Sequence, residues 1–211
     1  MRLLKIFVLS TLISTFAFAQ DNLPNNGYAL SFGISQNFTL SDFDGFIAFK
    51  KIFNSGNQLR FLLRPQYTHK TNKYENRAPF DEEEIITSDL ALYGGADYLW
   101  RLLQKNNVQM YGGCGFLLGY GYGKAEQTLI YNDTVFTPTQ KVTSWKYELR
   151  GILGVEWSVS KNIGLHAEYI LNFRYDTIEN KLKSRNGTHQ SENYDRFSLG
   201  QSVCFGISFY L

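Results

Sequence analysis

Cysteine, proline and histidine are scarce in this chain, and their scarcity excludes several classes of protein. The 211 residues include only 2 cysteines, 4 prolines and 3 histidines. Cys114 and Cys204 lie far apart in strand-like stretches, on opposite faces, so we expect two free thiols and not a disulfide framework. The histidines are scattered, and no Cys/His cluster has the spacing of metal ligands. We therefore expect neither a metal site nor a cofactor.

A long apolar run is missing after residue 20, which excludes a transmembrane helix from the rest of the chain. Before that point, Arg2 and Lys5 precede an apolar stretch that ends in the triplet AFA, the arrangement of an export signal. The alternative is an uncleaved membrane anchor, but the apolar stretch is shorter than the roughly 20 residues that a spanning helix needs. We predict that residues 1–19 are a cleaved signal peptide and that residues 20–211 form one domain.

The chain also lacks an excess of charge of either sign. It has 21 Lys+Arg and 19 Asp+Glu, and the predicted signal peptide contains two of the basic residues and none of the acidic ones. The mature chain then has 19 basic and 19 acidic residues and no net charge. Because a neutral chain has no general electrostatic attraction to nucleic acid, we exclude nucleic acid as a partner.

What the chain has in abundance is alternation of bulky apolar residues with small or polar ones, which is typical of β-strands with two unlike faces. The C-terminal segment is the clearest example, because one of its faces carries Val203, Phe205, Ile207, Phe209 and Leu211. Seven further segments repeat the pattern, and the weakest of them is FDGFIAFKKIF, where neither face is cleanly polar. The pattern predicts an all-β fold, an eight-stranded antiparallel up-and-down barrel.

The connections between these segments alternate between short turns and stretches of about twenty residues, near 70–86, 124–143 and 176–195. We interpret the long stretches as loops at one rim, as in transmembrane barrels. Trp145 and Trp157 share one face and are twelve residues apart, which projects to roughly 30 Å along a tilted strand. We predict aromatic girdles at the two membrane surfaces, made of Tyr98, Trp100, Tyr120, Tyr122, Trp145, Trp157, Phe173 and Tyr175.

The polar faces carry charges of both signs, and a membrane barrel would enclose them. We predict an ion-pair network in the lumen, made of Arg60, Arg64, Asp89, Asp97, Lys146, Glu148, Arg150, Glu156, Glu168 and Arg174. A turn near Ser160 would place Arg150 diagonal to Glu168, and Glu148 diagonal to Arg174. The alternative is a soluble, lipocalin-like barrel, with its many aromatic residues inside and its charges in water. We favour the membrane barrel, because the second surface of the soluble one would be largely Gly and Ser.

These segments resemble the small eight-stranded outer-membrane barrels of Gram-negative bacteria, the OmpA transmembrane domain and OmpX type, over the whole mature chain. The apolar C-terminal segment Val203–Leu211 is similar to the signal that the barrel-assembly machinery reads, although such proteins usually end in Phe. Pro65 inside a strand is a second departure, and we expect a β-bulge there. The resemblance implies a location in the bacterial outer membrane, contact with its lipid and lipopolysaccharide, and insertion by the assembly machinery.

The family has several functions, so three hypotheses stay open. The first is a non-enzymatic structural, envelope or surface-interaction role through the long extracellular loops, with an unknown external partner. The second is a narrow pore or a channel for hydrophobic small molecules. The third is a lipid A-modifying enzyme, because His189-Gln190-Ser191 is similar to the His-x-Ser of outer-membrane lipid A deacylases. That triplet stands alone in a predicted loop, so we assign no catalytic residue. We interpret the acidic run at 81–84 as solvated charge.

Overall fold

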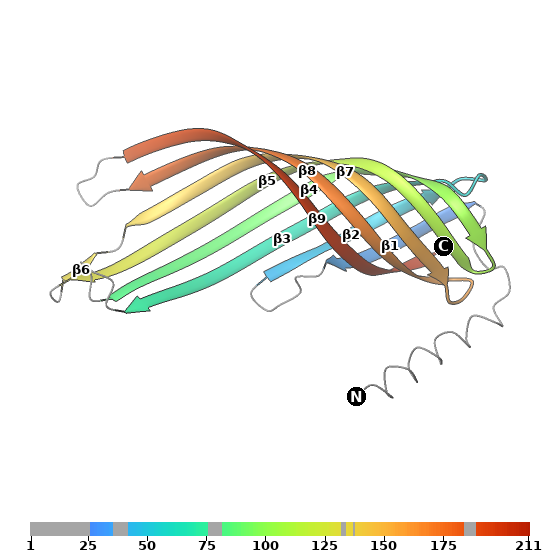
Figure 1. Ribbon diagram of the computed structural model, residues 1–211, viewed down its shortest axis with the longest axis horizontal. Helices are drawn as coiled ribbons and strands as arrows, with labels where there is room; N and C mark the ends of the chain where they lie inside the picture. Colours follow the sequence, from blue (N-terminus) through green and yellow to red (C-terminus); the bar gives the residue numbers. More distant parts are fainter. Residues whose placement is uncertain (1–25, 36–41, 76–81, 132–133, 137, 184–188) are drawn as a thin grey trace, which may run out of the picture.

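A computed structural model describes residues 26–35, 42–75, 82–131, 134–136, 138–183 and 189–211, so the predicted signal peptide lies outside the described residues. Figure 1 shows long strands wound side by side into an elongated barrel, with the short connections gathered at one end. The strands are β1 (Gly27–Ser35), β2 (Asp42–Ile52), β3 (Gln58–Glu75), β4 (Glu82–Lys105), β5 (Val108–Tyr131), β6 (Thr134–Phe136), β7 (Thr139–Ser158), β8 (Ile163–Lys183) and β9 (His189–Tyr210). These described stretches contain no helix long and apolar enough to cross a membrane.

The sheet closes on itself, and its neighbouring strands are antiparallel. β1 pairs with β2 along one edge and with β9 along the other, where Phe32 lies opposite Ile207. The Leu211 N–H donates to the Tyr28 carbonyl at 2.9 Å next to this seam. β6 is a three-residue addition that pairs with the end of β5. The other eight strands form the predicted up-and-down barrel, so the predicted fold class is confirmed.

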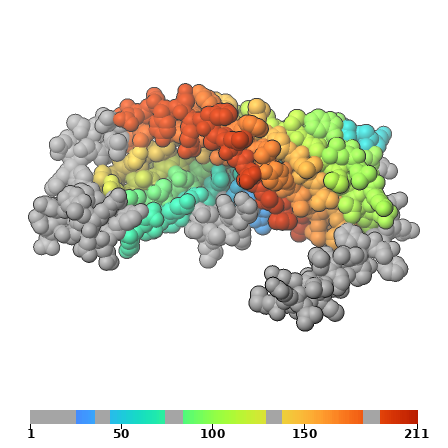
Figure 2. Space-filling model, in the orientation of Figure 1, coloured from blue at the N-terminus to red at the C-terminus, as the bar shows by residue number. Residues whose placement is uncertain are grey.

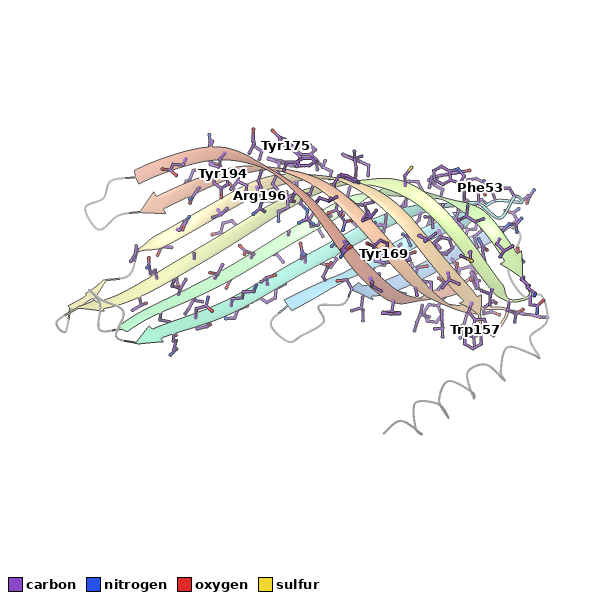
Figure 3. All side chains as sticks on the ribbon, in the orientation of Figure 1. Phe53, Trp157, Tyr169, Tyr175, Tyr194 and Arg196 are labelled. Atoms are coloured by element: carbon purple, nitrogen blue, oxygen red, sulfur yellow. The ribbon has the colours of Figure 1, made fainter. Side chains whose placement is uncertain are left out.

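The apolar half of each strand faces outward. Phe61, Leu149 and Phe205 are large apolar side chains, yet they are 52%, 59% and 61% exposed. The other half of each strand points into the barrel, where Arg60 is fully buried. Figure 3 shows Trp157 and Tyr175 projecting away from the ribbon. A continuous apolar exterior is costly in water and suited to lipid. The lipocalin-like alternative, which needs the apolar faces inside, is therefore wrong.

Six strands continue far beyond the apolar band, which corrects the prediction of long loops. The β3–β4 ladder stays in register from Gln58 opposite Leu99 to Glu75 opposite Glu82. β5 with β7, and β8 with β9, extend in the same way, so that most of 70–86, 124–143 and 176–195 is strand. Figures 1 and 2 show these strands continuing the barrel wall beyond the ends of β1 and β2.

The sequence pattern missed this extension for a physical reason. Outside lipid neither face of a strand has to be continuously apolar, so the alternation that identifies the membrane-spanning part fades. The backbone ladder itself does not depend on the polarity of the side chains, and it continues. We name the part of β3, β4, β5, β7, β8 and β9 beyond the level of Tyr122 and Trp145 the sheet extension.

The expected β-bulge at Pro65 is absent. Pro65 lies opposite Leu92 in an uninterrupted β3–β4 ladder. On its other side, the β2–β3 pairing stops at Asp44 opposite Gln66 and resumes in the same register at Ile47 opposite Leu63. Proline has no N–H to donate. The β2–β3 ladder is interrupted beside it, and no extra residue is inserted. The irregularity in the β4–β5 ladder lies elsewhere, between Arg101 and Leu103.

The two cysteines are free, as expected. Cys114 is exposed on the outer face of β5, whereas Cys204 is buried on the inner face of β9. A disulfide between them is impossible without turning one strand over, because successive side chains of a strand point to opposite faces.

Candidate functional site

Layers of polar side chains fill the lumen, and the first lies near the short turns. Lys50 on β2 donates to Glu156 on β7 at 3.0 Å and to the Ser208 hydroxyl on β9 at 2.9 Å. Ser208 in turn donates to Glu156 at 2.6 Å and lies 3.0 Å from the Ser31 hydroxyl. Because all four side chains are fully buried, this layer fills the end of the barrel where β1 begins and β9 ends.

The second layer crosses the middle of the barrel around the Arg60 guanidinium. Arg60 donates to Asp97 at 2.8 Å and to Glu168 at 2.5 Å. Arg150 lies 3.2 Å from the same Asp97 carboxylate, and the Tyr111 hydroxyl donates to Glu168 at 2.7 Å. These are charge-assisted bonds between side chains that water does not reach. The layer links strands β3, β4, β5, β7 and β8, and its buried side chains fill the lumen at mid-height.

A third layer lies toward the sheet extension and is centred on Glu148. This carboxylate accepts from Arg64 at 3.0 Å and from Arg174 at 2.9 Å. Arg64 also donates to Asp44 at 2.7 Å, and its guanidinium lies 5.5 Å from the centre of the Tyr93 ring. Glu148 and Arg174 are directly opposite on β7 and β8, one step from the diagonal that a turn near Ser160 predicts.

The fourth layer, at the mouth of the lumen, is only partly paired. Arg196 donates to Asp176 at 2.8 Å. Lys146 and Asp89 also line this part of the lumen, but neither has an ion-pair partner within 4.0 Å among the residues that the structure describes. Along the axis of the lumen, the charged side chains therefore change from all being in ion pairs to being only partly paired.

The structure brings together most of the predicted network. All ten predicted residues lie on the inner face, and eight of them form direct ion pairs, the exceptions being Asp89 and Lys146. The pairing of Arg150 differs from the prediction, because it contacts Asp97 and not Glu168. Within the described part of the lumen, four charged residues that the sequence pattern did not assign also form ion pairs: Asp44, Lys50, Asp176 and Arg196.

Three of these four omissions have an identifiable cause. Lys50 and Lys51 are adjacent in the weakest segment, so their faces could be assigned only from the register with β1, where Lys50 lies opposite Ala29. Asp176 and Arg196 fell in a stretch interpreted as loop. The two residues lie opposite each other on β8 and β9. A prediction that continued both strands would have paired them.

Glycine residues on β5 give the ion pairs their room. A Cβ atom at Gly115 would lie 1.8 Å from Asp97 Oδ1, and one at Gly119 would lie 2.5 Å from the Tyr93 ring. Neighbouring side chains therefore lie directly over the β5 backbone. The glycine-rich sequence of this strand does not leave an empty lumen; it lets large side chains from β4 fill it.

We expect Gly115→Val to destabilise the barrel by about 1–3 kcal/mol, because the new side chain must displace Asp97 from its two arginines. The matched control is Gly200→Val, since a Cβ atom at Gly200 has no neighbour within 4 Å. Urea titration of both variants in lipid vesicles, followed by tryptophan fluorescence, measures the difference. Equal midpoints for the two variants would contradict this role of Gly115.

Aromatic side chains lie on the outer face at two levels. Tyr98 and Trp100 are in edge-to-face contact near the short turns, with ring centroids 5.3 Å apart. Tyr120 and Trp145 are paired in the same way, also at 5.3 Å, near the sheet extension. Between the two levels the outer face is aliphatic and aromatic. The remaining residues of the predicted girdles, Tyr122, Trp157, Phe173 and Tyr175, also point outward.

Solved structures of bacterial outer-membrane proteins share this fold. A major outer membrane protein from Thermus thermophilus has a TM-score of 0.52 at 10% identity, over 88% of this chain and 99% of that chain. Neisserial surface protein A has a TM-score of 0.40 at 16% identity, over 87% and 93% of the two chains. Acinetobacter baumannii CarO2 has a TM-score of 0.42 at 9% identity, over 88% of this chain and 98% of that chain. This chain has the fold of an outer-membrane β-barrel protein. No protein-family model and no curated protein sequence matches it.

The sheet extension inverts the polarity of the apolar band. Its outer face carries exposed pairs of opposite charge, such as Lys73 with Glu84 at 3.1 Å and Lys181 with Glu179 at 2.9 Å. The hydrogen bond from Lys181 lowers the pKa of the Glu179 carboxyl. Its inner face carries Ile178, which is buried. Beyond the aromatic rings the outer face is therefore charged and suited to water, and the predicted girdles would place the membrane boundary at those rings.

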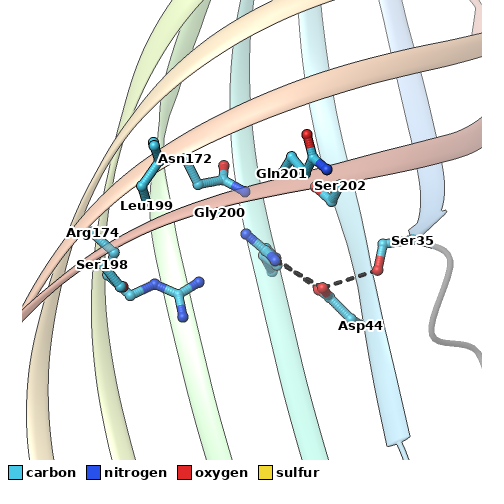
Figure 4. A pocket seen from close by; sticks show the side chains of 10 residues that line it. Ser35, Asp44, Asn172, Arg174, Ser198, Leu199, Gly200, Gln201 and Ser202 are labelled. Atoms are coloured by element: carbon cyan, nitrogen blue, oxygen red, sulfur yellow. Dashed lines mark hydrogen bonds and ion pairs between the residues drawn. The ribbon is translucent and has the colours of Figure 1, made fainter.

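A hollow of about 200 Å³ lies inside the barrel where β9 extends past the end of β1. Figure 4 shows Asn172, Arg174 and Ser202 around it, with Asp44 bonded to the Ser35 hydroxyl, at 3.0 Å, and to Arg64. The charges that border it already satisfy one another, because Arg64 and Arg174 share Glu148. We therefore assign this hollow to the third layer of the lumen and not to a separate site.

The residues considered for catalysis lie on paired strands. His189 and Ser191 belong to β9, opposite Lys183 and Lys181 of β8, and not to a loop. Ser191 is exposed. Within the described part of the chain, no group of three or more His, Cys, Asp or Glu residues is placed to hold a metal ion. Asp81, the first residue of the acidic run, lies outside the described residues.

Proposed function

We propose that this outer-membrane barrel is a closed, non-enzymatic scaffold that displays its sheet extension at the cell surface for an envelope or surface-interaction role. The mid-height layer of the lumen is the observation that carries the proposal. Arg60, Asp97 and Glu168 are at most 1% exposed and are joined by direct ion pairs. A solute would have to separate buried charges in order to pass, and separating a buried pair is strongly unfavourable.

The sheet extension supports the surface role. Paired lysine and glutamate side chains on its outer face, such as Lys124 with Glu126, project from rigid strands just beyond the aromatic rings. The hydrogen bond from Lys124 to Glu126 raises the pKa of Lys124. In an outer membrane this level meets the phosphates and sugars of lipopolysaccharide, and ammonium groups bind phosphate. We propose lipopolysaccharide as the lipid partner and Val203–Leu211 as the segment that the barrel-assembly machinery reads.

Planar lipid bilayers test whether the lumen is closed. We expect no single-channel steps from the purified barrel at ~100 mV of either sign, a potential worth about 2.3 kcal/mol per elementary charge, in bilayers where a general porin gives steps. The protein must be shown to be inserted in the same preparation, by resistance to protease and by a shift in gel mobility on boiling. Reproducible steps from inserted protein would contradict the proposal.

A narrow pore is the second candidate, and the shared carboxylate of Glu148 is the observation that favours it. Arg64 and Arg174 contact Glu148 at 3.0 and 2.9 Å, and Arg150 lies 3.9 Å away. Three arginines around one acceptor can exchange partners with little change in the number of ion pairs. If steps are observed, a change of their size in Glu148→Gln would assign the gate to this layer.

A further inference from the structure

The mouth of the lumen contains a cavity that the closed scaffold does not explain. It measures about 340 Å³ and lies above the third layer, among strands β3, β4, β5, β7, β8 and β9. Four charged side chains line it, one from each of four strands: Asp89 (β4), Lys146 (β7), Asp176 (β8) and Arg196 (β9). Their signs alternate around the wall and their formal charges cancel. The cavity therefore matches a ligand that carries both charges and no net charge.

Asp176 lines this cavity and has an unused acceptor atom. The residue is fully buried, and its Oδ2 atom accepts from Arg196 at 2.8 Å. Its Oδ1 atom is buried and has no hydrogen-bond partner. A buried carboxylate oxygen without a donor is unfavourable, and a ligand ammonium group in the cavity would supply that donor.

Lys146 and Asp89 face the same cavity without pairing to each other. Both lie over β5, because a Cβ atom at Gly121 would be 2.9 Å from Lys146 Cε and one at Gly123 would be 2.1 Å from Asp89 Oδ1. These two glycines are about 7 Å apart along the strand. The ammonium of Lys146 lies 5.8 Å from the Tyr93 ring centre, with no carboxylate within 4.0 Å among the described residues. One free cation and one free anion thus remain side by side.

We propose that this cavity binds a small zwitterion of the α-amino acid type. The ligand carboxylate would pair with Lys146, and its ammonium with Asp89 and with the unused oxygen of Asp176. Ala91, Val142 and Ile178 supply an apolar wall for an aliphatic side chain. A metal cation fits less well, because the ammonium of Lys146 stands between the carboxylates. A simple anion fits less well, because each cation has a carboxylate neighbour on the adjacent strand.

Isothermal titration of the protein, purified from membranes in detergent micelles, tests the assignment with three probes of similar shape. L-leucine carries both charges, isopentylamine only the ammonium, and 4-methylpentanoate only the carboxylate. Because each charge-assisted hydrogen bond contributes at least about tenfold in affinity, we expect L-leucine to bind at least about tenfold more tightly than either single-charge probe. No heat with L-leucine, or equal affinities for the three probes, would overturn the proposal.

Variants locate the site. We expect Lys146→Met and Asp89→Asn each to weaken L-leucine binding by about tenfold or more, and Lys146→Arg to retain most of it. The matched control is Lys124→Met, because Lys124 is an exposed lysine on the outer face that pairs with Glu126. The boiling shift in gel mobility verifies that each variant is folded. Binding that survives both Lys146→Met and Asp89→Asn, or that is lost equally in Lys124→Met, would place the ligand elsewhere.

Discussion

Arg60→Ala is expected to lower the free energy of unfolding by about 3–5 kcal/mol, because it leaves two carboxylates buried without their shared cation. Asp97 and Glu168 both accept from Arg60, at 2.8 and 2.5 Å. Arg150, at 3.2 Å from Asp97, can compensate only one of them. Unfolding in urea from lipid vesicles, with the fraction folded read from gel mobility without boiling, measures the loss.

The matched control for Arg60→Ala is Lys73→Ala, which removes a cation from an ion pair of similar length. Lys73 and Glu84 are 3.1 Å apart, but the Lys73 side chain is 62% exposed. An exposed pair contributes about 0–1 kcal/mol, since water solvates both partners. If the two variants unfold at the same urea concentration, the mid-height layer does not stabilise the barrel. That result would contradict a lumen held closed by these ion pairs.

The orientation of the side chains was predictable from sequence because it depends on one periodicity. In a strand, side chains two residues apart share a face, so the sequence of β7 alone places Trp145 and Leu149 on one side and Glu148 and Arg150 on the other. In the other membrane-spanning strands except β2, only one face is likewise consistently apolar, so the alternation by itself decides which face points outward.

The choice of ion-pair partners was not predictable in the same way. It depends on register between strands and on which side chains reach across the lumen. Arg60 contacts Glu168 on β8, which is 108 residues away in sequence and on a strand that does not neighbour β3. Such contacts follow from closure of the sheet and from the diameter of the lumen. The alternation of side chains along one strand gives no information about closure of the sheet or about the diameter of the lumen.

The sheet extension was missed because the rule that identified the spanning strands does not apply to it. Thr71 pairs with Ile86, and Lys73 with Glu84, in a continuous ladder. These residues lie beyond the apolar band, so no consistently apolar face marks them. The mouth cavity was missed for the same reason, since Asp176 and Arg196 become neighbours only when β8 and β9 continue as strands.

Leu149→Arg is expected to destabilise the inserted barrel by about 2–4 kcal/mol, the cost of placing a guanidinium near the middle of the hydrocarbon layer. Leu149 is 59% exposed on the outer face of β7, between Trp145 and Trp157. A soluble protein would tolerate arginine at so exposed a position within about 0.5 kcal/mol. The predicted effect thus depends entirely on what covers this face.

Thr177→Arg is the matched control for Leu149→Arg, because Thr177 is also exposed but lies opposite Trp145, at the level of the aromatic rings. There the expected cost is about 0–1 kcal/mol, since the guanidinium reaches the lipid headgroups. Urea unfolding of both variants from the same vesicles gives the two values. The difference between the two free energies reports depth in the membrane. Arginine is the introduced residue in both variants, and both positions are on the outer face. Equal destabilisation by the two substitutions would mean that the aromatic rings do not mark the membrane surface, and the boundary between spanning strands and sheet extension would have to be drawn elsewhere.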